Sequence, residues 1–196
     1  MLTVKKEGVL LSKTDAEFDR FGVLNPGVIQ EGQDVHVFYR AVGEGNYSTI
    51  GYCRLRGPLL VVERHDSPIV FPQFSYECQG TEDPRIVKID GLYYLSYTAY
   101  DGVNAMGALA VSSDLVHWEK RGILVPQLTF AEFIRLATTH GPLNEKYSRY
   151  NDHENLTGIN GNRALLWDKN LVFFPRRING MIYFLHRIKP DIKIVS

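Results

Sequence analysis

The sequence is poor in the features that define several classes of protein. It has only two cysteines, Cys53 and Cys78, whose spacing fits neither a metal-binding motif nor a disulfide scaffold. Basic and acidic residues balance at 22 each, so no net charge draws the chain to nucleic acid or to an anionic membrane. No apolar run approaches the roughly 20 residues that span a bilayer. We therefore expect reduced core cysteines and no nucleic-acid or membrane partner.

The start of the chain also lacks the pattern of a secretion signal. Met1 is followed by Leu-Thr-Val-Lys-Lys-Glu, with no basic segment leading into an apolar one. A cytoplasmic protein is the resulting expectation. The length of 196 residues is sufficient for one compact domain with a substantial core.

Three stretches of the chain repeat one pattern, which is a proline, a short strand, a glycine turn and an aromatic-rich strand. Pro26 and Pro84 open the first two copies and lie about 58 residues apart, a blade's length by the repeat-period rule. Such repetition is typical of a β-propeller, in which each four-stranded blade packs against its neighbours. The copies span residues 25–41, 83–99 and 174–188, with turns at Glu31-Gly32, Asp90-Gly91 and Asn179-Gly180.

The number of copies is smaller than a closed ring requires. About three blades and part of a fourth fit the chain, whereas propellers close with about four to eight. The chain is then part of a larger propeller, or completes a ring as a homo-oligomer, or leaves an open sheet edge. We favour the first because residues 189–196 begin another strand and stop without a cap. The prediction is an all-β fold, with residues 1–196 forming a partial propeller domain.

The segment from about residue 126 to residue 167 interrupts the repeats and is predicted to be an insertion. Thr129 and Glu132 match a capping box, and apolar residues from Phe130 onward recur at helical spacing. A short amphipathic helix is therefore expected. The polar residues 147–155 are interpreted as a loop, either over a site or simply solvated.

The densest group of chemically active side chains is Glu82-Asp83-Pro84-Arg85, which opens a predicted strand. In a propeller the innermost strands begin around the central channel, so residues at this position converge on one pocket. A carboxylic acid there can donate a proton to a leaving oxygen, and burial or a second carboxylate raises its pKa toward the useful range. The alternative is an ion pair between Glu82 and Arg85 that stiffens the strand entry, and these four residues alone do not decide.

Two arginines add to this cluster. Arg40 and Arg187 each follow the aromatic strand of their repeat at nearly equivalent places. The planar guanidinium matches the oxygens of phosphate, so two of them facing one channel would form an anion site. The alternative is that both pair with carboxylates such as Glu82 from neighbouring blades.

Five motifs stand together in this chain: Asn25-Pro26 with Tyr39-Arg40-Ala41, Gly80 to Arg85, Tyr97 to Asp101, Ser113 to Trp118, and Phe174-Pro175 with His186-Arg187. This set resembles glycoside hydrolase family 130, the five-bladed propeller enzymes that include mannosyl-glucose and β-mannooligosaccharide phosphorylases. The resemblance covers nearly the whole chain outside the insertion. It implies that Asp83 is the catalytic acid, that Arg40 and Arg187 hold phosphate or sugar, and that Asn25 lines the sugar pocket. Further candidates for substrate or phosphate binding in these motifs are Glu82, Arg85, Asp101 and His186.

The resemblance also implies a reaction. Phosphate attacks the anomeric carbon of a β-mannoside with inversion, the acid protonates the bridging oxygen through a sugar hydroxyl, and mannose 1-phosphate is released. Inorganic phosphate is then a co-substrate, a manno-oligosaccharide or mannosyl sugar is the partner, and no cofactor is expected. No metal is expected either, because the adjacent Asp152, His153 and Glu154 would rarely converge on one ion.

Two alternative functions remain open from the sequence. Some relatives in the resembling family are inverting β-mannoside hydrolases, which use water in place of phosphate. An inactive carbohydrate-binding fragment of a propeller is the other alternative, since a five-bladed ring would need further blades. The insertion also prevents the preference for an acceptor sugar from being carried over.

Overall fold

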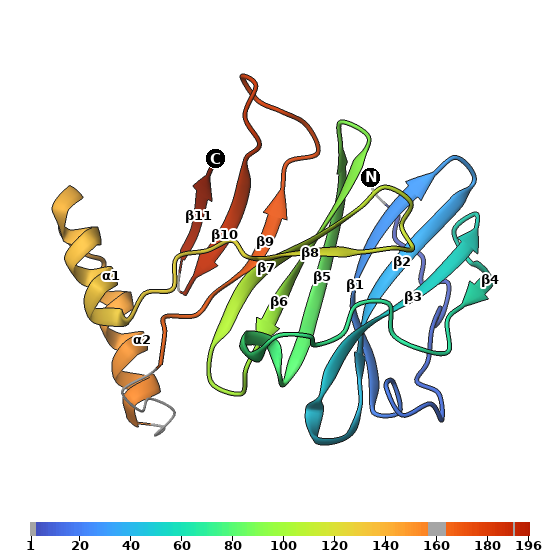
Figure 1. Ribbon diagram of the computed structural model, residues 1–196, viewed down its shortest axis with the longest axis horizontal. Coiled ribbons are helices and arrows are strands. Elements are labelled where there is room, and N and C mark those ends of the chain that lie inside the picture. Colours follow the sequence, from blue (N-terminus) through green and yellow to red (C-terminus); the bar gives the residue numbers. More distant parts are fainter. Residues whose placement is uncertain (1–2, 157–163, 190) are drawn as a thin grey trace.

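The computed structural model describes residues 3–156, 164–189 and 191–196. Its strands form one open mixed sheet, and the all-β prediction is confirmed apart from a helical segment near one end (Figure 1). The strands are β1 (Gly22–Glu31), β2 (Asp34–Val42), β3 (Ser48–Arg56), β4 (Leu60–Arg64), β5 (Gly80–Ile89), β6 (Leu92–Tyr100), β7 (Ala105–Ser112), β8 (Glu119–Ile123), β9 (Asp168–Phe173), β10 (Phe184–Ile188) and β11 (Asp191–Val195).

The sheet consists of three consecutive antiparallel units, which lie side by side in Figure 1. Strands β1 to β4 form the first unit, β5 to β8 the second, and β9 to β11 the third. Neighbouring units meet through short parallel pairings, Ser48 with Gly80 and Met106 with Asp168. The repeats of the sequence are therefore structural units of the fold.

Tight turns join the first two strands of the first two units. Asp90 and Gly91 form the turn of the second unit, with φ of 51° and 83°, as its two-residue length demands. In the first unit the turn lies at Gly32-Gln33 rather than at the expected Glu31-Gly32, because Glu31 still pairs with Asp34.

The third repeat differs from its predicted alignment. Its Asn179-Gly180 turn is present, with φ of 51° and 79°. However, Pro175 follows strand β9 instead of opening it, and the connection to β10 is longer than in the other units. The aromatic-rich strand expected directly after this turn begins only at Phe184. A short extra hairpin between Ile178 and Met181 accounts for the shift.

The main core lies between the first and second units. Aromatic and branched side chains that alternate along β2, β3, β6 and β7 meet there, which explains why these strands are rich in such residues. A fully buried carboxylate, Glu77, accepts a hydrogen bond from the Tyr97 hydroxyl at 2.9 Å and pairs with Lys120. This satisfied network ties the crossing from β4 to β5 to strands β6 and β8 of the second unit.

Helices occupy the segment between β8 and β9. Helix α1 (Phe130–Ala137) begins with the expected capping box, in which Thr129 and Glu132 bond each other. Helix α2 (Glu145–Leu156) replaces the loop that was expected over residues 147–155, so that interpretation was wrong. Its sequence has little apolar periodicity, and Tyr147, packed against Phe133, is its main buried contact among the described side chains.

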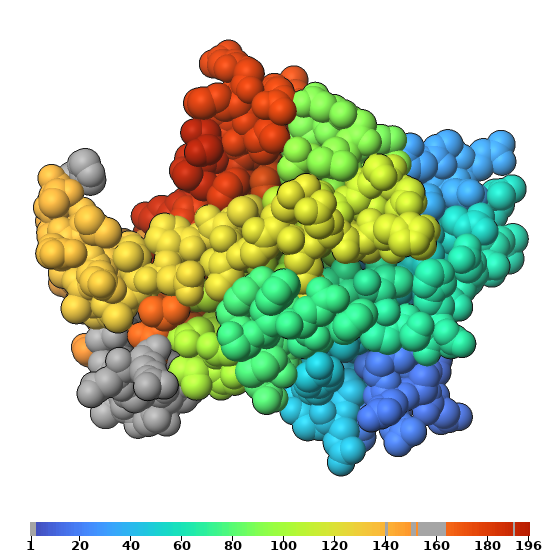
Figure 2. All heavy atoms as spheres, in the orientation of Figure 1, coloured from blue at the N-terminus to red at the C-terminus, as the bar shows by residue number. Residues whose placement is uncertain are grey.

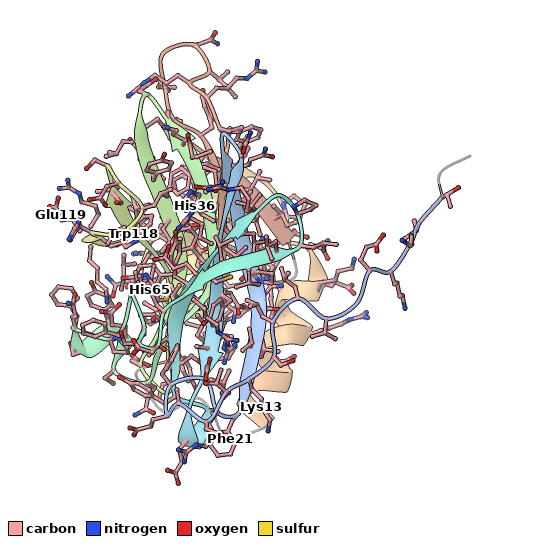
Figure 3. The ribbon with its side chains drawn as sticks, turned by 90° about the vertical axis from the view of Figure 1, so that its right-hand side faces the viewer. Lys13, Phe21, His36, His65, Trp118 and Glu119 are labelled. Carbon is pink, nitrogen blue, oxygen red and sulfur yellow. The ribbon has the colours of Figure 1, made fainter. Side chains whose placement is uncertain are left out.

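The surface has two other notable segments. Residues 3–9 are exposed and extend away from the sheet (Figure 3). The chain after β7 runs across one face toward the helices (Figure 2). Both cysteines are free, but Cys78 is exposed rather than in the core as expected. No helix in the described part of the chain is long and apolar enough to span a membrane.

A first prediction concerns the contact between β1 and β5. A Cβ atom at Gly27 would lie 2.8 Å from the Pro84 carbonyl oxygen, which belongs to the backbone and cannot swing aside. We expect Gly27→Ala to lower the free energy of unfolding by about 1–3 kcal/mol, as in overpacked cores. Gly22→Ala on the same strand is the control, because its Cβ would meet nothing closer than 3.7 Å. Equal denaturant midpoints for the two variants would contradict the close approach.

Candidate active site

The site is built on a β-bulge that recurs in the first strand of each unit. In β1, β5 and β9 two residues oppose one residue of the partner strand, and the first of the two has a left-handed backbone. These residues are Asn25, Asp83 and Asn170, with φ of 44°, 51° and 61°. Asparagine and aspartate tolerate this conformation better than other side-chain-bearing residues, which explains their presence. The bulges redirect the three side chains.

Two of these side chains contact each other across the boundary between units. The Asn25 amide donates to Asp83 Oδ1 at 2.7 Å. The contact depends on the missing side chain of Gly27, which lets β1 approach Pro84 of β5. Asp83 therefore sits in a fixed orientation at a junction of two units.

An open recess of about 430 Å³, here called the acid recess, lies at the three bulges. It brings together four of the residues proposed from the sequence: Asn25, Asp83, Arg85 and Arg187. Arg85 is exposed, and its predicted ion pair with Glu82 is absent from the described side chains. The recess is lined by Asn25, Pro26, Asp83, Pro84, Arg85, Asn170 and Arg187.

Arg40 is anchored within the protein. Its guanidinium lies 2.8 Å from Glu82 Oε1 and 3.6 Å from Asp83 Oδ1, and it donates to Ser48 Oγ at 2.9 Å. The side chains of Arg40 and Glu82 are 14% and 8% exposed, so this is a buried pair between the first and second units. For Arg40 the ion-pair alternative is confirmed, which leaves little of its guanidinium for a second anion.

Arg187 has different surroundings. It occupies the position in β10 that Arg40 occupies in β2, because each pairs with the residue just before the bulge. The Asn170 amide, with its oxygen turned toward Arg187, accepts from both terminal nitrogens at 3.1 and 3.3 Å. Among the described residues, Arg187 has no carboxylate within ion-pair distance. Its positive charge is thus directed into the acid recess without a countercharge there except Asp83.

A second recess adjoins the first on the side of Glu82. It measures about 230 Å³ and is here called the aromatic recess; it is lined by Arg40, Asn46, Glu82, Tyr100, Ala105, Trp167 and Lys169. Burial raises the pKa of the Glu82 carboxyl, opposed by Arg40 and Lys169 and reinforced by Asp83. Burial lowers the pKa of the Lys169 ammonium, opposed by Glu82 and Asp83. Opposite charges from three units are thus held close together around Asp83.

Two proposed residues line neither recess. Asp101 caps the loop after β6, where its Oδ1 accepts from the backbone amides of Val103 at 2.8 Å and Asn104 at 2.6 Å. His186 lies opposite the β9 bulge, on the other face of the strand from Arg187. Its Nδ1 is 2.7 Å from Oδ1 of the buried Asp168.

Three residues of the site were missed in the sequence: Trp167, Lys169 and Asn170. The misplaced third repeat is one reason, because it aligned Phe174-Pro175 with Asn25-Pro26, whereas Asn170-Leu171 occupies that place in the structure. One signal was available in the sequence. The spacing between Asn25 and Arg40, applied backwards from Arg187, ends close to Asn170. In the part of the chain that the structure describes, no three potential metal ligands cluster. The side chains of His153 and Glu154 lie outside the described residues.

A carboxylic acid at an open recess can protonate the leaving oxygen of a glycosidic bond, and an arginine beside it can hold an anion. Comparison with known families agrees with this chemistry. The family model Glyco_hydro_130, described as beta-1,4-mannooligosaccharide phosphorylase, matches residues 11–195. The chain belongs to glycoside hydrolase family 130.

Individual relatives point the same way. The chain is 29% identical over 196 residues to 1,2-beta-oligomannan phosphorylase of Thermoanaerobacter sp. (strain X514), covering 95% of this chain and 53% of that protein. Beta-1,2-mannobiose phosphorylase of the same organism is 33% identical over 127 residues, which are 57% of this chain and 42% of that protein. The chain thus spans about half the length of the curated relatives it matches.

Solved structures share the fold. Beta-1,2-mannobiose phosphorylase from Listeria innocua, in complex with β-1,2-mannobiose, gives a TM-score of 0.58 at 17% identity over 88% of this chain and 55% of that one. A structure from work on family 130 hydrolases that target β-1,2 mannosidic linkages in Candida mannan gives 0.53 at 25% identity, over 58% of this chain and 38% of that one.

A second prediction tests the buried pair. Arg40→Met should lower the free energy of unfolding by about 3–5 kcal/mol, because it leaves the Glu82 carboxylate buried without its partner. Arg40→Met combined with Glu82→Gln should recover part of this loss, since glutamine carries no charge. Arg187→Met is the matched control and should cost less, because Arg187 contacts an uncharged amide. Urea denaturation of wild type, these variants and the Glu82→Gln single variant completes a double-mutant cycle, and purely additive effects of the two changes would contradict the pairing.

Proposed function

We propose that this protein cleaves β-mannosides by phosphorolysis, with Asp83 as the general acid. The observation that carries the proposal is that one recess presents Asp83 together with the guanidiniums of Arg85 and Arg187. Family membership and the phosphorylase names of two relatives support the substrate class. Because the chain covers about half of those relatives, the activity is that of the complete protein.

The proposed reaction uses Asp83 as a proton donor. Inorganic phosphate attacks the anomeric carbon of the mannosyl unit from the side opposite the bridging oxygen, and the bond to that oxygen breaks. The Asp83 proton reaches the bridging oxygen through a sugar hydroxyl, so the products are mannose 1-phosphate and a shortened sugar. The Asn25 amide donates to Oδ1 of Asp83, which orients the carboxyl while its other oxygen carries the proton.

Phosphate is proposed to bind on the Arg187 side of the acid recess. Arg187 already donates to an uncharged partner, and a phosphate can take over or share those donors, since charge-assisted bonds are the stronger ones. Arg85 is exposed at the same recess and adds a second guanidinium. Arg40 instead is held by Glu82 and orients Asp83. Phosphate is the co-substrate, and the reaction needs no further cofactor.

The three units are proposed to be three blades of a five-bladed propeller. Their antiparallel strands, their parallel contacts between units and the convergence of the three bulges on one recess support this arrangement. In such a ring the bulges face the central channel, and residues of further blades would complete the walls of the acid recess. Activity assays therefore belong on the complete protein.

Phosphate dependence separates this function from its alternatives. Incubation with β-1,2-mannobiose, the sugar bound to a structural relative, should release mannose 1-phosphate only when inorganic phosphate is present. Free mannose released equally with and without phosphate would identify a hydrolase. Sugar binding without either product would identify a carbohydrate-binding protein.

A third prediction concerns the acid. Asp83→Asn should lower turnover by about 100-fold or more, because general acid catalysis contributes about 10²–10⁴. The fold should survive, since an amide oxygen can still accept from Asn25. Asp90→Asn, at an exposed turn far along the strand, is the control and should retain turnover. Near-normal turnover by a folded Asp83→Asn protein would exclude Asp83 as the acid.

A fourth prediction separates the two arginines. Arg187→Lys should raise the Michaelis constant for phosphate more than that for the mannoside, because an ammonium cannot reproduce the two-pronged contact. Arg40→Lys should mainly lower the melting temperature and kcat, since Arg40 holds Glu82 and Asp83. Steady-state kinetics at varied phosphate, beside a melting curve for each variant, gives both readouts. A similar rise in the phosphate constant for both variants would mean that the arginines act as a symmetric clamp.

A further inference from the structure

The aromatic recess has a composition that the acid and the phosphate site do not explain. Two aromatic side chains from distant parts of the chain meet in it: Tyr100 at the end of β6 and Trp167 just before β9. Their ring centroids are 6.4 Å apart and the rings are nearly perpendicular, at 76°. Ligand-binding recesses are commonly lined by aromatic side chains together with a few polar groups, and this pair opens into such a recess.

Trp167 is held in place by the loop after β6. Its indole nitrogen donates to the Val103 carbonyl oxygen at 2.9 Å, and the Leu165 amide donates to Asn104 Oδ1 at 2.7 Å. These two bonds tie the segment that leads into β9 to a loop of the second unit. The position of the indole is therefore set by a hairpin loop and not by the core of its own unit.

Asp101 shapes that loop. Its Oδ1 accepts from the backbone amides of Val103 and Asn104, and its Oδ2 accepts from the Asn104 side-chain amide at 2.9 Å. The last bond turns Asn104 so that its oxygen faces the Leu165 amide. A chain of hydrogen bonds thus runs from Asp101 through Asn104 to the segment that carries Trp167.

The recess also supplies hydrogen-bond donors next to its aromatic rings. The Lys169 ammonium lies 5.1 Å from the Trp167 ring centre, and Arg40 and Asn46 also line the recess. A sugar ring presents an apolar C–H face and a rim of hydroxyls, so it can pack on an indole while its rim bonds to cations and carboxylates. The volume of about 230 Å³ suits one sugar ring rather than an oligosaccharide.

The recess is placed for a ring close to the reacting bond. Glu82, which lines the aromatic recess, is the chain neighbour of Asp83, which lines the acid recess. Arg40 contacts both carboxylates. A ring in the aromatic recess is therefore within one sugar unit of the acid.

We propose that Trp167 is a specificity-determining residue that packs on one sugar ring of the substrate, and that Asp101 and Asn104 are positioning residues that act through it. The identity of the sugar as a mannoside rests on the proposed function. The candidate role of Asp101 thereby changes from substrate binding to support of the recess wall.

Tryptophan fluorescence tests the contact without requiring turnover. Trp118, labelled beside Glu119 in Figure 3, lines neither recess, and its ring centroid lies 5.5 Å from that of Phe38. Titration with β-1,2-mannobiose in the absence of phosphate should change the emission of the wild-type protein and of Trp118→Phe. The change should be lost in Trp167→Phe. Retention of the full change in Trp167→Phe, or its absence from Trp118→Phe, would overturn the proposal.

Kinetics test the specificity role. Trp167→Ala should raise the Michaelis constant for the mannoside about tenfold, the equivalent of losing one good aromatic contact, and leave that for phosphate unchanged. The mannoside Michaelis constant of Trp167→Phe should lie between those of the wild type and Trp167→Ala. This variant remains a test if the alanine variant fails to fold. Asp101→Ala should shift the mannoside constant in the same direction, and Asp101→Asn, which keeps one acceptor oxygen for the loop amides, should shift it less.

The outcomes distinguish this proposal from the proposed function. Phosphorolysis would be refuted if the wild-type protein showed no phosphate-dependent turnover. The sugar contact would still be upheld if the wild type showed the fluorescence change and Trp167→Phe did not. Unchanged mannoside constants in folded Trp167→Ala and Trp167→Phe proteins would refute the sugar contact and leave phosphorolysis standing. Equal rises of the mannoside and phosphate constants in all variants would show a merely structural role for Trp167 and Asp101.

Discussion

The left-handed bulge at Asp83 is the constraint on which the rest of the site depends. A regular strand would alternate its side chains between the two faces of the sheet, and Asp83 would lie in the ladder with its neighbours. The bulge instead turns the carboxyl toward Asn25, whose own bulge presents the amide at 2.7 Å. Close approach of the two strands at Gly27 makes this contact possible. The same device repeated in β9 brings Asn170 and Arg187 to the acid recess.

The electrostatics around the acid follow from this geometry. Glu82 and Lys169 occupy the position just before the bulge in their units, which places a buried carboxylate and a partly buried ammonium near Asp83. Burial disfavours the charged form of each, and their mutual attraction, with Arg40, opposes that effect. Arg40 and Arg187 are equivalent by strand register and different in surroundings. Arg40 forms an ion pair with Glu82, whereas Arg187 contacts the uncharged Asn170 amide and faces the acid recess.

The sequence predicted the first two repeats, the turns at Asp90-Gly91 and Asn179-Gly180, the capping box of α1 and four of the residues of the acid recess, because each of these depends on local pattern or spacing. It could not place Trp167 or Lys169, since their importance comes from contacts with residues far away in the chain. It could not show that Asp101 caps a loop, or that His186 lies on the other face of its strand from Arg187, because a motif does not reveal hydrogen-bond partners or strand faces. Helix α2 was missed since its sequence has little apolar periodicity, and Tyr147, which is buried among its described side chains, contacts Phe133 of another helix.

The central claim is that the acid and the phosphate share one recess with the sugar beside them. A crystal structure of the complete protein in its Asp83→Asn form, soaked with β-1,2-mannobiose and inorganic phosphate, tests it most directly. We expect phosphate within hydrogen-bond distance of Arg187 and the bridging oxygen of the sugar on the side of residue 83. Phosphate bound at Arg40 with Arg187 unoccupied, or a sugar bound away from both recesses, would contradict the account.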